Sequence, residues 1–192
     1  MKWWEKTVEY YFILKHVDPN LLVSPLDGKE EKLGDTIISS NNKWVLIEFK
    51  RDESCLSSEI KKFYDYEKAL TKLSDKDDHH YLIYGEFNGN FRLNCKTYFS
   101  AKDRDSIESA LKTGIDKNAF AKYVEEFTGL KNPPDGGGGA GGLSLADYSL
   151  VACVKDDGNI VECMSISDYQ QSMGYEPDPE PMQQPGSRSM RM

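Results

Sequence analysis

The chain has 192 residues, of which 39% are hydrophobic and 11% aromatic, enough apolar side chain to bury one core. Its formal net charge of -8 argues against a broad polyanion-binding surface, which requires clustered lysine and arginine. Residues 1–100 carry 15 basic and 17 acidic side chains, whereas residues 101–192 carry 9 and 15, so most of the acidity lies in the second half.

The first half of the sequence predicts the order helix, three strands, helix, strand. Residues 2–16 have apolar side chains at helical spacing, and the charges among them exclude a signal peptide or a membrane span. Short apolar runs predict strands at residues 21–26, 35–39 and 44–50. A one-sided apolar pattern predicts a helix over residues 57–73, followed by a strand at 80–87. We therefore expect an α/β three-layer sandwich, with a mixed central sheet flanked by helices around an αβββαβ core.

The second half predicts C-terminal helices and a hairpin. Further elements are expected at residues 92–99 (strand), 103–112 and 117–128 (helices), and 149–155 and 160–164 (the strands of the hairpin). Proline and glycine dominate residues 132–142, which predicts a linker or loop. The expected domain organisation is an α/β domain at 1–130, a Gly-rich linker or loop at 131–143, a β-hairpin extension at 144–173 and a disordered tail at 174–192.

Two carboxylates and a lysine form the most informative pattern. If residues 40–43 make a hairpin loop, Asp35 lies opposite Glu48 in the strand ladder. Lys50 follows two residues later, so the strand period of two places it on the same face as Glu48. Facing carboxylates repel each other unless a cation lies between them, and Mg²⁺ or Mn²⁺ suits oxygen ligands. Such a metal activates water and polarises a phosphoryl oxygen, which is the chemistry of phosphodiester hydrolysis.

A purely structural explanation competes with this one. Glu-x-Lys occurs often by chance and is common on solvated strand faces. However, the strand WVLIEFK is apolar enough to be buried on both faces, which makes exposure a weaker explanation for Glu48 and Lys50.

The motif Gly34-Asp35 with Glu48-Phe49-Lys50, together with the order of elements, resembles the PD-(D/E)xK, or restriction-endonuclease-like, nuclease superfamily. The resemblance covers about the first 90 residues, and Gly34 stands where the family often has proline. It implies that Asp35 and Glu48 ligate the metal and that Lys50 serves the attacking water. It also implies a further acidic residue from the first helix, for which Glu5 and Glu9 are equal candidates.

Several other polar residues have two interpretations. Lys61, Lys62 and Tyr64 could contact a phosphate backbone, although a solvated helix face explains them as well. His79 and His80 could be metal ligands, but a polar turn entering a strand is the simpler interpretation. The cysteines have no C-x-x-C or zinc spacing, which predicts reduced thiols in a cytoplasmic protein.

The function predicted from these features is metal-dependent hydrolysis of DNA, with RNA as the second choice. The alternative is a nuclease-fold protein that acts without catalysis, as a binding module, complex subunit or inhibitor. The acidic charge suggests that a protein partner or a homo-oligomer contributes to nucleic-acid binding, and no membrane association is expected.

Overall fold

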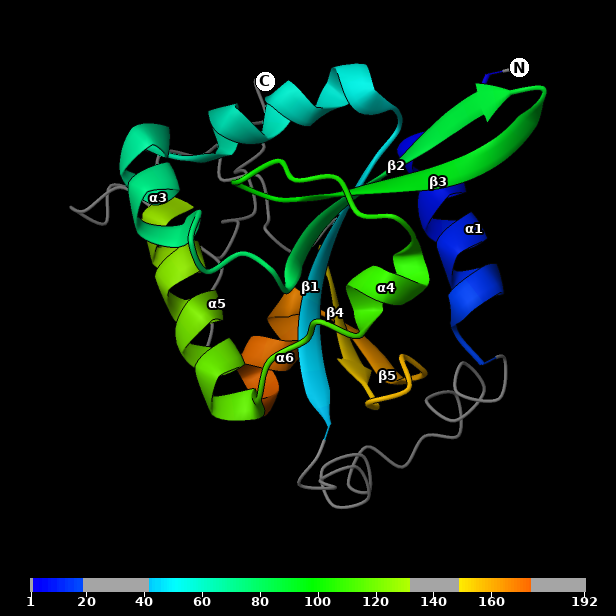
Figure 1. The fold of residues 1–192 in the computed structure, drawn as a ribbon. Helices are drawn as coiled ribbons and strands as arrows, with labels where there is room; N and C mark the ends of the chain where they lie inside the picture. The colour runs from blue at the N-terminus through cyan, green and yellow to red at the C-terminus, as the bar shows by residue number, and fades with distance from the viewer. Residues whose placement is uncertain (1, 19–41, 132–148, 174–192) are drawn as a thin grey trace, which may run out of the picture.

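The computed structural model describes residues 2–18, 42–131 and 149–173. Its centre is a five-stranded mixed sheet of order β3-β2-β1-β4-β5 (Figure 1). The strands are β1 (Lys43–Lys50), β2 (His80–Asn88), β3 (Asn90–Thr97), β4 (Ser149–Val154) and β5 (Ile160–Ser165). The helices are α1 (Glu5–His16), the 3₁₀ helix η3 (Glu53–Lys62), α3 (Tyr66–Leu73), α4 (Ile107–Leu111), α5 (Lys117–Lys131) and α6 (Ile166–Ser172).

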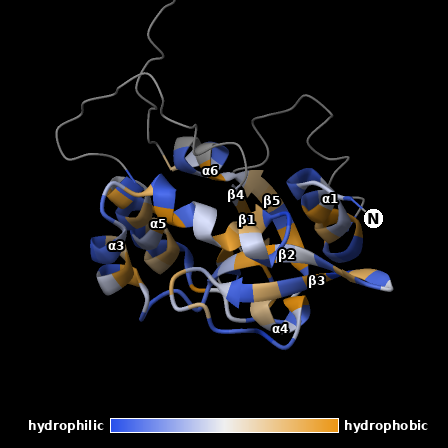
Figure 2. Cartoon of the chain, turned by 90° about the horizontal axis from the view of Figure 1, so that it is seen from above, coloured by the Kyte–Doolittle hydropathy of each residue, from blue (hydrophilic) through white to orange (hydrophobic). Residues whose placement is uncertain are grey.

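Helices cover both faces of the sheet, which confirms the expected α/β sandwich. Alternate residues of β1 point to opposite sides. Trp44 and Leu46 join a core with α3, α5 and α6, whereas Val45 and Ile47 join a second core with α1 and α4. Figure 2 shows apolar residues gathered in the strands between the two helical layers. No helix in the described parts of the chain is both long and apolar enough to cross a membrane.

The central strand β1 has neighbours on both edges. It runs parallel to β2 and antiparallel to β4, and Glu48 lies between Leu82 and Ser149. The predicted ladder pairing of Glu48 with Asp35 is therefore wrong, because both ladder positions beside Glu48 are taken. The predicted strands at 21–26 and 35–39 lie outside the described residues.

Two other expectations are corrected. The helix predicted over residues 57–73 is two helices, because Phe63 is extended and buried and Asp65 caps α3 by accepting a hydrogen bond from the Lys68 backbone at 3.0 Å. The hairpin predicted as an extension at 144–173 is part of the central sheet, since β4 pairs along β1. The predicted linker at 132–142 and the tail at 174–192 lie outside the described residues.

Candidate functional site

A buried cluster of charged side chains lies toward the carboxyl end of β1. It contains three carboxylates and three ammonium groups, contributed by α1, β1, η3 and α5: Glu5, Glu48, Glu59, Lys50, Lys62 and Lys131. Glu48 is fully buried, and Lys50 is only 4% exposed. Both belong to β1 and are two residues apart, so the prediction that they share one face is confirmed.

The Glu48 carboxylate is held from three directions. Its Oε1 accepts a hydrogen bond from the Ser149 hydroxyl at 2.5 Å and lies 3.5 Å from the Lys131 ammonium. Its Oε2 lies 3.3 Å from the Lys62 ammonium. Ser149 thus occupies the ladder position that the sequence assigned to Asp35, and Asp35 itself lies outside the described residues.

The Lys50 ammonium lies between two further carboxylates. It is 2.5 Å from Glu59 Oε1 and 3.7 Å from Glu5 Oε1. Burial raises the pKa of Glu5, and the nearby Lys50 and Lys62 only partly offset this effect. Burial also raises the pKa of Glu59, but there Lys62 and Lys50 outweigh it and leave the pKa below its ordinary value. Glu59 is therefore the more firmly ionised partner of Lys50.

Lys62 links the two buried carboxylates of the cluster. Its ammonium lies 2.8 Å from Glu59 Oε1 and 3.3 Å from Glu48 Oε2. Burial lowers the pKa of Lys62, but Glu48 and Glu59 together outweigh burial and raise it. Its side chain is 26% exposed, so of the two lysines that contact Glu48 it is the one that solvent reaches.

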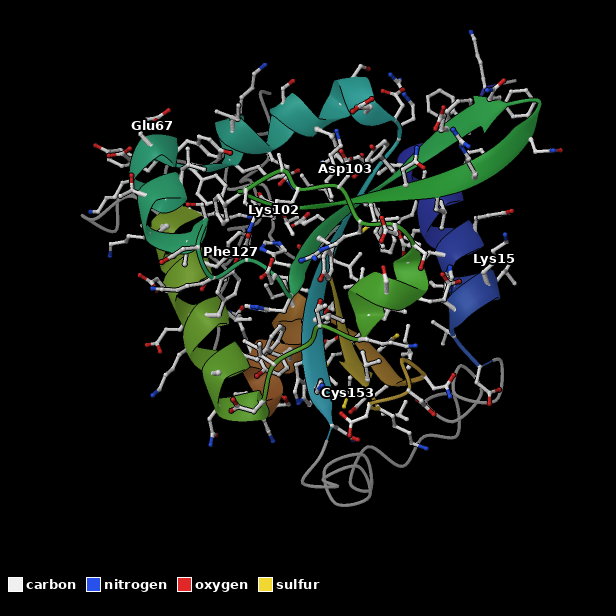
Figure 3. All side chains as sticks on the ribbon, in the orientation of Figure 1. Lys15, Glu67, Lys102, Asp103, Phe127 and Cys153 are labelled. Atoms are coloured by element: carbon white, nitrogen blue, oxygen red, sulfur yellow. The ribbon has the colours of Figure 1, made fainter. Side chains whose placement is uncertain are left out.

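Lys131 is buried against aromatic rings at the end of α5. Its ammonium lies 4.1 Å from the centre of the Phe127 ring and 5.5 Å from that of Phe63. Figure 3 shows Phe127 directed from α5 toward the interior. Burial lowers the pKa of Lys131, although the Glu48 carboxylate opposes that effect. The ion pair with Glu48 thus favours the charged form of this lysine.

The structure distinguishes between candidate site residues that the sequence could not rank. Of the two acidic residues on α1, Glu5 reaches Lys50, whereas Glu9 forms its ion pair with Lys6 at 2.7 Å. Among the polar residues assigned to the following helix, Lys62 enters the cluster. Lys61 and Tyr64 are exposed, and Tyr64 is 69% accessible.

Three residues of the site were missed by sequence reasoning. Glu59 precedes Lys62 by one helical turn, and this spacing is the only sequence signal that pointed to it. Lys131 lies at the edge of the proline- and glycine-rich segment, and Ser149 begins a strand 101 positions after Glu48. Neither has a local pattern that associates it with Glu48, because the contacts depend on tertiary packing.

The described residues do not by themselves fit a divalent metal. Carboxylate oxygens are the ligands that Mg²⁺ prefers. However, three ammonium groups neutralise the three carboxylates of the cluster, and the described parts of the chain contain no group of three or more His, Cys, Asp or Glu side chains that could hold a metal ion. A cation at Glu48 would need a second carboxylate from outside the described residues, the role proposed for Asp35, and displacement of Lys62.

The expected turn that enters a strand is present, because residues 78 and 79 form a turn and His80 begins β2, but both histidines are buried. His80 is fully buried, with its Nδ1 2.9 Å from the Tyr123 hydroxyl and its ring stacked on Tyr98. His79 is 3% exposed and packs edge-on against Tyr123. Burial lowers the pKa of His79 to about 4 and outweighs the opposing effect of Asp78. Aromatic packing thus accounts for the placement of both rings, although neither Nε2 atom has a hydrogen-bond partner among the described residues.

Acid is expected to destabilise the protein through His79. The pKa of this group in the folded protein, about 4, is below the ordinary 6.5, so the unfolded chain binds the proton first as pH falls. The free energy of unfolding should fall by about 2–3 kcal/mol from this residue between pH 7 and pH 4.5. Urea denaturation at both pH values measures it. His79→Asn should reduce the pH dependence by that amount, and an unchanged dependence would contradict the prediction.

Comparisons with known proteins return no relatives: no protein-family model, no curated protein and no solved structure matches the chain. Its function has to be inferred from its own residues.

Proposed function

We propose that this chain is a metal-dependent nuclease that hydrolyses phosphodiester bonds, with DNA as the first substrate class and RNA as the second. One observation carries the proposal: Glu48 and Lys50 are both buried on the same face of the central strand, within a cluster of charges. Buried ion pairs are often no more stabilising than apolar side chains of similar size. Burial of so many charges is therefore better explained by chemistry than by stability.

In this proposal, different residues would bind the metal, orient the attacking water and contact the substrate. Asp35 and Glu48 would hold Mg²⁺ or Mn²⁺, which when bound polarises the scissile phosphate and lowers the pKa of a water ligand. Lys50 would orient the attacking water and stabilise negative charge that develops on the phosphate oxygens. Lys62, at the accessible edge of the cluster, and the exposed Lys61 and Tyr64 would contact the nucleic-acid backbone.

A second candidate function rests on a different observation. Every carboxylate of the cluster has an ammonium partner within 3.7 Å, so the described site is electrically balanced without a metal. This balance favours a nuclease fold that serves as a non-catalytic binding module, a complex subunit or an inhibitor. In either case the net charge of -8 favours a protein partner or a homo-oligomer, and we place the protein in the cytoplasm.

The proposal is tested by cleavage of supercoiled plasmid, linear duplex, single-stranded DNA and RNA with Mg²⁺ or Mn²⁺, and with EDTA in place of metal. The wild type is compared with Asp35→Asn. Cleavage that requires metal and is lost in the variant supports the nuclease. If the folded wild type cuts none of the four substrates under either metal, the non-catalytic function takes its place.

Glu5 and Glu9 provide a matched pair of variants on one helix. Glu5→Gln is expected to slow cleavage about tenfold, equivalent to about 1.4 kcal/mol in the activation barrier, because it removes a carboxylate 3.7 Å from Lys50. Glu9→Gln should cut at the wild-type rate, since Glu9 pairs with Lys6. Equal rates for the two variants under single-turnover conditions would exclude Glu5 from the site.

A further inference from the structure

We propose that Glu59 is the positioning residue for Lys50, and that the Tyr98 hydroxyl fixes Glu59 in the orientation that holds the ammonium. The catalytic meaning of this arrangement rests on the proposed nuclease function. The arrangement itself does not, because it concerns only how the ammonium is held.

The two oxygens of Glu59 have separate partners. Oε1 lies 2.5 Å from the Lys50 ammonium, and Oε2 accepts a hydrogen bond from the Tyr98 hydroxyl at 2.6 Å. The carboxylate is 3% exposed, so water does not compete effectively for either oxygen. With one oxygen fixed by the phenol, the other is presented to Lys50 at a defined position.

Tyr98 is held in place by its own surroundings. It directly follows β3, and its backbone N–H donates a hydrogen bond to the carbonyl oxygen of His80 at 2.9 Å. Its ring stacks on the His80 ring, with centroids 4.0 Å apart and an interplanar angle of 13°. His80 is in turn fully buried and bonded to Tyr123. The phenol oxygen that contacts Glu59 is therefore held in place by packed aromatic side chains.

The other partner of Lys50 is less able to position it. Glu5 lies 3.7 Å away, its side chain is 28% exposed, and it belongs to the first turn of α1. Lysine is a flexible side chain, and it needs a short, buried contact to define where its ammonium lies. Glu59 supplies that contact. Lys62 shares the same oxygen at 2.8 Å but is itself partly exposed, so it adds charge balance rather than a fixed direction.

In the proposed reaction, this arrangement should affect the chemical step and not substrate binding. Glu59 and Tyr98 would act through Lys50 and would not touch the substrate. Loosening the ammonium should therefore weaken stabilisation of the transition state and leave substrate binding unchanged. A general loss of folding would instead lower the amount of active protein and the melting temperature together.

Two substitutions test this arrangement in the full chain. Tyr98→Phe removes only the hydroxyl, and Glu59→Gln keeps the shape but removes the charge. Their controls are Tyr169→Phe, whose buried hydroxyl has no hydrogen-bond partner among the described residues, and Glu126→Gln, a carboxylate that pairs with Lys72 and Lys76. Expected kcat values are several-fold lower for Tyr98→Phe and at least tenfold lower for Glu59→Gln, with KM unchanged. Both controls should match the wild type.

A second measurement does not depend on activity. The rate at which an amine-acylating reagent modifies Lys50 is followed by mass spectrometry of peptides, with the exposed Lys102 as internal reference. Modification of Lys50 should become at least threefold faster in Tyr98→Phe, and faster still in Glu59→Gln. An unchanged rate in Tyr98→Phe, with the melting temperature retained, would overturn the proposal. Faster modification in a protein that cuts nothing would support the positioning role and reject the nuclease.

Discussion

Lys50→Met is expected to reduce metal-dependent cleavage by about 10²–10⁴-fold, the range found when a charge-stabilising or proton-transferring group is removed from an active site. Methionine keeps most of the length of the lysine side chain and removes its charge. The loss should appear in kcat, because the ammonium would interact most strongly with the charge that develops in the transition state.

The fold should tolerate this substitution. Glu59 is left with Lys62 at 2.8 Å and with the Tyr98 hydroxyl at 2.6 Å, so its charge remains compensated. Lys50 is the last residue of β1, and its side chain is not part of either apolar core. Circular dichroism and a melting curve should therefore resemble those of the wild type, which separates a catalytic loss from unfolding.

The matched control is Lys72→Met, which removes a lysine that pairs with Glu126 on the surface of α3 and α5. It should cleave at the wild-type rate. Cleavage by Lys50→Met within a factor of three of the wild type, under single-turnover conditions, would remove Lys50 from the catalytic site and leave the buried charges with a structural role.

The local periodicity of the sequence was enough to predict which residues of β1 face the charged side. Strand residues two apart share a face whatever the rest of the fold does, so Glu48 and Lys50 could be assigned together. The same reasoning failed for Asp35, because it assumed that neighbouring strands in the sequence are neighbours in the sheet. In the structure β4, about 100 residues later, takes the antiparallel position beside β1.

The sequence does contain a signal for the break between η3 and α3. Asp65 lies three residues before Lys68, the spacing of a helix N-cap, and Phe63 is an apolar residue that packs inward between the two helices. The assembly of Glu59 and Lys131 around Glu48 and Lys50 had no comparable signal. It depends on where η3 and α5 pack against the sheet, and one sequence does not specify that directly.

Glu48→Leu is expected to lower the free energy of unfolding by about 3–5 kcal/mol, the cost of removing one partner of a buried ion pair. Lys131 would lose its only carboxylate contact within 4 Å among the described residues while its ammonium stays among aromatic rings. Ser149 would lose the acceptor of its hydrogen bond at 2.5 Å. Urea denaturation gives this free energy, provided that its slope against urea concentration is the same in the variant and the wild type.

The double variant Glu48→Leu, Lys131→Met should recover most of that loss, because two apolar side chains then fill the volume of a charged pair. Lys131→Met alone should cost less than Glu48→Leu alone, since Glu48 keeps Lys62 and Ser149. If the double variant loses as much free energy of unfolding as the two single variants together, the two side chains are not coupled. Glu48 would then not stabilise the fold through its ion pair with Lys131. A double variant that is stable but cuts no nucleic acid would show that the fold can do without this buried pair and the reaction cannot.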